Sequence, residues 1–211
     1  MTSIPAALRH FSTTDVASHR VQFNPEAWRT TFADHGEALT QLAHHAHTEG
    51  GIARAYIHHR ADTDPIELFL ISMVWGYGKV GYGPRRISDI LNQVGAVDKL
   101  RAIVETTSND GAAAGWNALL NTHRIGGLDM SFGTKLLYFA GYTTDHRPRP
   151  LILDNVVRTA LQDAAPGTVP ASGRVHRDDY IRYLQLAEDW AADPEWNVEP
   201  DVIEYALFNQ R

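Results

Sequence analysis

Cysteine is absent from the 211 residues, and this absence excludes two kinds of structure. Without thiols the chain has no disulfide framework and no thiolate ligands for an iron–sulfur cluster. Long apolar runs are missing too: no 18-residue stretch is apolar throughout, so no membrane-spanning helix is predicted. The first residues lack the basic-then-apolar order of a signal peptide, and we therefore expect a cytoplasmic protein.

Positive charge is also scarce, since the formal net charge at pH 7 is -6. Its distribution is uneven: residues 76–182 carry 13 Lys and Arg against 10 Asp and Glu, whereas the flanks carry 6 against 15. The middle of the chain therefore falls short of the strongly basic face of a non-specific nucleic-acid binder. It suits a protein that contacts a few phosphates, partly through backbone amides.

Apolar and polar residues nowhere alternate with the sustained period of two that marks a half-buried strand. Helical patterns dominate, and two of them open with a cap and a proline, at Asn24-Pro25 and Asp64-Pro65. Helices are expected over residues 24–47, 66–75, 87–94, 97–107, 112–120, 134–142, 155–163, 177–192 and 200–209, with breaks at 76–84, 108–111, 143–150 and 166–173. We predict an all-α fold in one domain over residues 1–211, divided into two helical lobes.

A glycine-rich turn followed by a lysine is the most informative feature of the chain. The turn precedes a helix expected to start at Thr134, which places Lys135 in the first helical turn. The partial positive charge at a helix N-terminus disfavours a cation there and favours the free amine that a nucleophile needs. A lysine alone in such a place is most often a solvated surface group, so Lys135 needs a partner to be informative.

The turn itself is suited to phosphate binding. Backbone N–H groups at a helix N-terminus bind anions, and glycine lets a phosphate approach closely. Phosphate contacts are expected from Gly127, Ser131, Gly133 and Thr134. An ordinary turn between two helices would use the same residues, so the turn alone leaves both interpretations open.

Asp154 follows Lys135 by 19 residues, after a proline-rich connection. It is expected to cap the helix over 155–163, with its carboxylate facing the free amides of the first turn. An ionised carboxylate there could stabilise positive charge that develops on a sugar ring. The pair suggests an amine nucleophile and a carboxylate held over one sugar carbon, although capping alone would explain the aspartate.

Residues 112–163 resemble the helix-hairpin-helix, Gly/Pro-rich loop, aspartate superfamily of DNA base-excision glycosylases, and most of all the 8-oxoguanine DNA glycosylases. Phe132-Gly133-Thr134-Lys135 and Asp154 match the hairpin and aspartate of that family at the same 19-residue separation. The resemblance implies a cleft between two lobes, in which Lys135 attacks C1′ of a damaged nucleoside that has been flipped out of the helix. It also implies that Asp154 stabilises charge at that carbon, and that a Schiff base then permits strand cleavage by β-elimination.

The resemblance further implies a base pocket formed partly by the last helix, over residues 199–209. The family places a glutamine there that reads the base edge, and four residues later a phenylalanine that stacks on the ring. Here those positions hold Glu204 and Phe208. Phe139 stands where eukaryotic relatives place a cysteine, and it would complete an aromatic sandwich around the base with Phe208.

Some positions depart from the family pattern. Ser131 replaces the first hairpin glycine, and Val156 replaces a histidine of the eukaryotic enzymes. Their β-rich N-terminal domain has no counterpart in this sequence. These departures affect the prediction of which damaged base is removed more than the prediction of how it is removed.

Residues 75–86 form the other unusual stretch, with four glycines, three aromatic residues and three cations. No strand precedes it, so the glycine spacing is not a dinucleotide-binding fingerprint. The resemblance implies that this region fills the hole left by the flipped base, with a tyrosine as wedge and an arginine on the orphaned base or a phosphate. The DNA-contacting residues expected here are Tyr77, Lys79, Tyr82, Arg85 and Arg86. A surface loop without function is the alternative.

No metal centre or organic cofactor is predicted. The histidines at positions 44, 45, 47, 58 and 59 lack a carboxylate or cysteine that would complete a ligand set. A structural monovalent or divalent cation at the hairpin stays open.

The expected function is that of a DNA glycosylase with lyase activity on abasic sites. Its partner would be double-stranded DNA with a damaged base, with 8-oxoguanine as the expected lesion, and it would act as a monomer associated with a bacterial-type nucleoid, without a membrane. One alternative changes only the base, for example to a hypermodified base of phage DNA. The other is a non-enzymatic module whose hairpin grips phosphate, which would require neither Lys135 nor Asp154.

Overall fold

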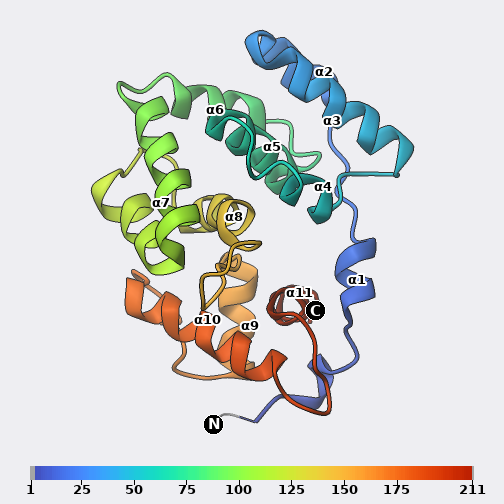
Figure 1. Cartoon of the computed structure of the whole chain (residues 1–211), viewed down its shortest axis with the longest axis vertical. Coiled ribbons are helices and arrows are strands. Elements are labelled where there is room, and N and C mark those ends of the chain that lie inside the picture. The colour runs from blue at the N-terminus through green and yellow to red at the C-terminus, as the bar shows by residue number, and fades with distance from the viewer. Residues whose placement is uncertain (1–2, 211) are drawn as a thin grey trace.

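The computed structural model describes residues 3–210, and helices make up its framework (Figure 1). Met1, Thr2 and Arg211 lie outside the described residues, and so does the start of the stretch in which no signal peptide was expected. Within residues 3–210 there is no strand, only an isolated bridge between Val21 and Ile52. The all-α prediction is confirmed, whereas the division into two lobes stays a prediction.

The α-helices are α1 (Thr13–Ser18), α2 (Pro25–Thr31), α3 (Gly36–Thr48), α4 (Arg54–His58), α5 (Pro65–Tyr77), α6 (Gly83–Leu91), α7 (Ala96–Asn117), α8 (Met130–Gly141), α9 (Asn155–Ala164), α10 (Arg177–Ala191) and α11 (Pro200–Asn209). Short turns of other helix types lie at η1 (Ala6–Leu8), η2 (Ala33–His35) and η3 (Ala118–Thr122). In the part of the chain that the structure describes, no helix is both long and apolar enough to cross a membrane.

Several helix boundaries follow the predicted signals. Asp64 accepts a hydrogen bond from the amide of Ile66 at 2.8 Å, and Pro65 begins α5. Gly111, inside the predicted break at 108–111, interrupts α7 with a left-handed φ of 81°. Local sequence is sufficient for these boundaries because each depends on one or two residues.

Helices α1 and α4 were not predicted, and several boundaries differ from the prediction. The single helix expected over 24–47 is divided into α2 and α3 at Phe32, whose buried ring stacks on Trp28 at a centroid distance of 5.8 Å. Helix α6 begins at Gly83 rather than at residue 87. Helix α8 begins at Met130 rather than at Thr134, because Asp129 caps it by accepting from the amide of Ser131 at 3.2 Å.

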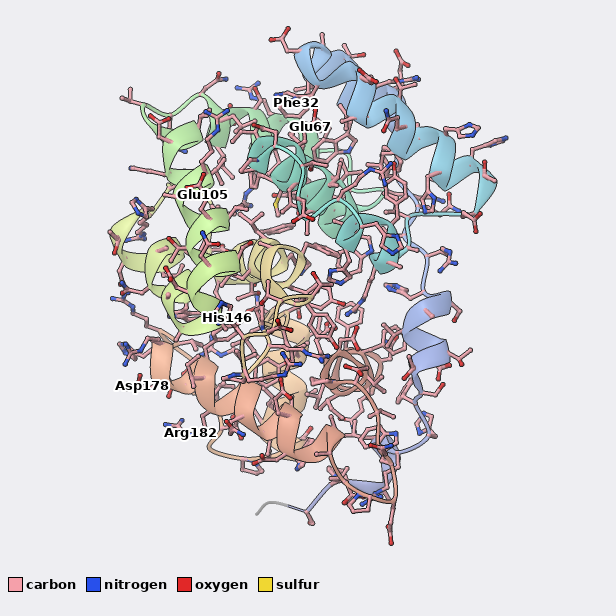
Figure 2. All side chains as sticks on the ribbon, in the orientation of Figure 1. Phe32, Glu67, Glu105, His146, Asp178 and Arg182 are labelled. Atoms are coloured by element: carbon pink, nitrogen blue, oxygen red, sulfur yellow. The ribbon has the colours of Figure 1, made fainter. Side chains whose placement is uncertain are left out.

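Helix α8 lies at the centre of the molecule (Figure 1), where it packs mainly against α7 and α5. Its residues from Gly133 to Gly141 are all buried, as expected for a helix that is apolar on nearly every side. Charged side chains such as Asp178 and Arg182 of α10 lie on the outside (Figure 2). Lys135 is therefore a buried charged-type side chain on a helix whose other residues are mostly apolar.

The N-terminal segment packs against the C-terminal helices. Helix α11 contacts α1, α9 and α10. Trp196 donates its indole N–H to the backbone oxygen of Phe11 at 2.9 Å, and Arg9 forms an ion pair with Asp193 at 3.1 Å. This packing brings residues near position 20 beside the last helix, where one wall of the candidate site forms.

Candidate active site

Helix α8 and the start of α9 bring Lys135 and Asp154 together. The Nζ atom of Lys135 lies 3.1 Å from Oδ2 of Asp154 and 3.1 Å from the backbone oxygen of Ser131. The two side chains are only 10% and 14% exposed, respectively. An amine and a carboxylate thus meet at a place that is nearly closed to solvent.

Asp154 is fixed by the helix that it begins. Its Oδ1 accepts from the amides of Val156 at 3.0 Å and Val157 at 3.1 Å, which is the predicted cap. Because these bonds use one carboxylate oxygen, the other is free to face Lys135. Val156, at the position of a histidine in eukaryotic relatives, contributes its backbone amide here.

The position of Lys135 in its helix corrects the sequence-based argument. Since α8 begins at Met130, Lys135 lies in the second turn, and the macrodipole acts mainly on the first. The amine instead lies near an aromatic side chain, with its Nζ 5.5 Å from the centroid of the Phe132 ring. Gly76 of α5 makes room for the lysine stem, because a Cβ there would lie 2.9 Å from Cδ of Lys135.

Thr134 holds the connection that delivers Asp154. Its Oγ1 accepts from the amide of Leu153 at 2.9 Å, and its side chain is fully buried. Tyr180 and Tyr183 of α10 extend this bracing: their hydroxyls donate to the backbone oxygens of Leu151 at 2.8 Å and Ile152 at 3.1 Å. These side chains supply the bonds that a neighbouring strand would supply in a sheet.

Of the four predicted phosphate contacts, the structure leaves two accessible. Thr134 and Gly133 are buried, and a Cβ on Gly133 would meet Leu119 at 2.4 Å, so both serve packing rather than phosphate binding. Gly127, with a φ of 82°, is exposed at the hairpin turn, and Ser131 is half-buried. Gln93, which the sequence did not mark, holds the turn by bonding the N–H and C=O of Gly126 at 3.0 and 2.8 Å.

A cavity of about 240 Å³ opens onto Lys135 and Asp154. Two further predicted residues, Glu204 and Phe208 of α11, line it as well. Phe208 is 38% exposed at this opening, so its ring is accessible to a ligand. Residues that lie far apart in the sequence therefore share one cavity.

Phe139 does not line this cavity, which corrects the predicted aromatic sandwich. It is fully buried, and Trp75 of α5 contacts it edge-on with a centroid distance of 5.4 Å. Trp75 lines the cavity in its place. The sequence marked Trp75 only as part of the glycine-rich stretch.

Glu204 is almost completely buried and forms an ion pair with Arg54 of α4, a partner that the sequence did not reveal. Burial raises the pKa of the Glu204 carboxyl, and the guanidinium acts in the opposite direction. Burial alone would lower the pKa of Arg54, but Glu204 and Tyr138 outweigh it and raise that pKa above its ordinary value. Arg54 therefore stays charged, with its Cζ 5.2 Å from the centroid of Trp75.

His19 completes the wall from the N-terminal segment. Its ring meets Trp75 edge-on at a centroid distance of 5.8 Å. Burial, with the charges of Arg54 and Arg20, lowers the pKa of His19 to about 4. The imidazole is therefore neutral near pH 7, with one donor and one acceptor nitrogen.

The glycine-rich stretch separates into a buried and an exposed part. Tyr77 is buried, lines the cavity and stacks on Phe132 at a centroid distance of 4.1 Å. Tyr82 is 63% exposed, so of the two tyrosines it is the one accessible for the predicted wedge. Lys79 is exposed. Arg86 donates to the backbone oxygen of Gly127 at 3.4 Å, so this stretch and the hairpin turn are neighbours. Arg85 is exposed and pairs with the adjacent Asp89 of α6 at 3.1 Å.

Metal ligands are not grouped within residues 3–210: no three His, Cys, Asp or Glu side chains lie where they could hold an ion. The expectation of a cation at the hairpin stays a prediction.

No curated protein and no solved structure matches the chain. A family model does match, and it covers residues 14–208. The chain therefore belongs to the family described as "Putative 8-oxoguanine DNA glycosylase OGG-like protein".

Proposed function

We propose that this protein is a DNA base-excision glycosylase with lyase activity on abasic sites, and that it acts on 8-oxoguanine. The observation that carries the proposal is the 3.1 Å contact between Lys135 Nζ and Asp154 Oδ2 at the wall of a cavity. Membership of the family supports glycosylase chemistry in general. The lysine nucleophile, the lyase step and the identity of the base are what the proposal adds.

The first step is the loss of a proton from Lys135. Asp154 Oδ2, hydrogen-bonded to the amine, is placed to accept it. The free amine then attacks C1′ while the bond from C1′ to the base breaks. The base leaves with the bonding electron pair and takes up the proton from Asp154, and the carboxylate that this transfer restores stabilises positive charge on the sugar.

The second step opens the sugar. The bond from C1′ to O4′ breaks, O4′ takes one of the two protons on the nitrogen, and a protonated Schiff base joins Lys135 to C1′. Loss of a proton from C2′ then expels the 3′ phosphate, which cleaves the strand. The low exposure of the Lys135 and Asp154 side chains supports this order of steps, because water would otherwise compete with the amine for C1′.

The hairpin turn and the glycine-rich stretch are proposed as the DNA contact. The exposed backbone of Gly127 is proposed to contact a phosphate, and the exposed Arg86 donates to its carbonyl oxygen. Lys79, in the same stretch as Arg86, is exposed as well and is proposed to contact the DNA. Tyr82 is proposed to fill the space of the flipped base. Ser131, at the start of α8, is the remaining candidate for a phosphate contact.

Trapping by borohydride tests the proposal, and the chain contains only three lysines with which to compare results. The wild-type protein should form a covalent adduct with a duplex that contains 8-oxoguanine, and Lys135→Gln should form none. Lys99→Gln is the matched control, since Lys99 is a half-buried side chain that does not line the cavity and whose Nζ bonds the backbone oxygen of Arg124 at 3.2 Å. Asp154→Asn keeps a capping side chain and should slow base release by roughly a hundredfold or more.

The outcomes separate the alternatives. An adduct at wild-type yield with Lys135→Gln would remove the assigned nucleophile. Adducts with a different modified base but none with 8-oxoguanine would favour a glycosylase of the same chemistry that acts on another base, such as a hypermodified base of phage DNA. If neither a modified base nor an abasic site yields an adduct, while duplex binding persists, the protein is a non-enzymatic binding module.

A further inference from the structure

Three buried polar atoms on side chains that line the active-site cavity have no hydrogen-bond partner: Arg54 Nε, Trp75 Nε1 and His19 Nδ1. Eight side-chain atoms of this kind occur among the described residues, so three of the eight belong to the cavity that holds Lys135. Burying a donor or acceptor without a partner destabilises the fold, and most such groups in proteins are paired. The concentration of unpaired atoms here points to a ligand that supplies the missing partners.

The chemistry of these atoms restricts that ligand. The Nε of Arg54 and the indole nitrogen of Trp75 can only donate hydrogen bonds. They belong to neighbouring side chains, because the guanidinium carbon lies 5.2 Å from the centroid of the Trp75 ring. The ligand must therefore present acceptor capacity for two adjacent donors.

Glu204 adds the complementary requirement. One of its carboxylate oxygens accepts from the Nη1 of Arg54, which also fixes the guanidinium. The second oxygen has lone pairs for an N–H of a ligand. The side chains that carry these two donors and this acceptor therefore line the same cavity.

We propose that Arg54, Trp75 and Glu204 select a base that carries a lactam, a ring carbonyl beside a ring N–H; this inference rests on the glycosylase function proposed above. A carbonyl oxygen has two lone pairs and can accept from both Arg54 and Trp75, and the neighbouring N–H donates to Glu204. An unprotonated ring nitrogen, as in adenine, has one lone pair and leaves one donor unpaired. 8-Oxoguanine carries two lactams, at C6=O with N1–H and at C8=O with N7–H.

The assignment separates base reading from sugar chemistry. Lys135 and Asp154 act on C1′, which is present whether or not a base is attached. The three selecting residues meet only the base. A variant that loses base reading should therefore keep its reaction with an abasic site, where no base has to be recognised.

Trp75→Phe tests this, because it removes the unpaired N–H and keeps an aromatic ring. Single-turnover release of 8-oxoguanine should fall about tenfold to a hundredfold, whereas borohydride trapping on an abasic duplex should change by less than about threefold. The melting temperature should stay the same or rise, since the indole N–H has no protein partner. Arg54→Lys, which keeps a cation beside Glu204 but lacks the Nε–H donor, should lower base release in the same way.

Trp196→Phe is the matched control. Its indole N–H bonds the backbone oxygen of Phe11, so this variant should lose stability yet keep the wild-type ratio of base release to abasic trapping. The inference is overturned if Trp75→Phe keeps that ratio, or if the wild-type protein traps abasic sites but releases no lactam-bearing base. Absence of trapping on abasic DNA by the wild-type protein would instead remove the proposed function itself.

Discussion

Lys135 reaches Asp154 because a residue of another helix has no side chain. Gly76 of α5 lies against the lysine stem, and a Cβ built there would approach Cδ of Lys135 to 2.9 Å and Cε1 of Phe132 to 3.2 Å. Both neighbours are side chains, and the lysine is flexible enough to move away. A methyl group at position 76 would therefore displace the nucleophile without disrupting the backbone.

Gly76→Ala should consequently impair the reaction more than the fold. A displacement of the amine by about 1 Å is expected to slow adduct formation roughly a hundredfold. Alanine inside a helix is favoured over glycine by about 1 kcal/mol, which offsets part of the crowding. Comparison of trapping rates with urea unfolding checks this, and equal rates for the variant and the wild type would show that the glycine is not needed to place Lys135.

The site residues illustrate which roles a sequence pattern can predict. Lys135 and Asp154 were predicted from a 19-residue separation and a cap, and the structure brings their side chains to 3.1 Å. Arg54 was not predicted, because its partner Glu204 lies 150 residues away and no local pattern connects the two residues. Phe139 was predicted to line the base pocket, but the sequence does not reveal that Trp75 packs against Phe139 and lines the cavity instead.

The connection between α8 and α9 is the element on which the position of Asp154 depends. Residues 150–153 form no hydrogen-bonded ladder, and their backbone is instead bound by the side chains of Thr134, Tyr180 and Tyr183. All three side chains are fully buried. An extended segment without a neighbouring strand is stable here because α8 and α10 each supply hydroxyl groups.

Tyr183→Phe should therefore destabilise the protein by about 1–3 kcal/mol, because it leaves the buried carbonyl of Ile152 without its partner. Denaturant unfolding measures this effect. Tyr82→Phe is the control, since the Tyr82 side chain is 63% exposed and its loss of a hydroxyl should leave the unfolding free energy within about 0.5 kcal/mol. A Tyr183→Phe protein as stable as the control would show that the bracing is not needed.

Over the whole molecule, stability should depend on pH through His58, a half-buried histidine outside the catalytic pair whose two ring nitrogens are buried. Neither ring nitrogen of His58 has a partner, and its ring packs against Tyr138 at a centroid distance of 4.7 Å. Burial, with smaller contributions from Arg54 and His59, lowers the pKa of His58 to about 3. The folded protein therefore holds His58 neutral at pH values where the unfolded chain protonates it.

Because the folded pKa lies below the unfolded value of 6.5, the unfolded state binds more protons between about pH 3 and pH 6.5. Stability should fall as the pH drops through this window, by about 2 kcal/mol for this group at pH 5. Urea unfolding at pH 5 and pH 7.5 measures the difference, and His58→Phe should reduce it. An unchanged difference in the variant would assign the pH dependence to other groups, such as His19.

The sequence by itself determined the helical fold, several helix starts and the pairing of Lys135 with Asp154. These depend on signals within a few residues: a cap, a proline, an apolar period, or a fixed separation across one connection. Tertiary structure alone decided that Lys135 lies in the second turn of a central helix, that Arg54 neutralises Glu204, and that Trp75 rather than Phe139 faces the cavity. Burial and ion pairing between distant segments depend on how whole helices pack, and no local pattern along the chain contains that information.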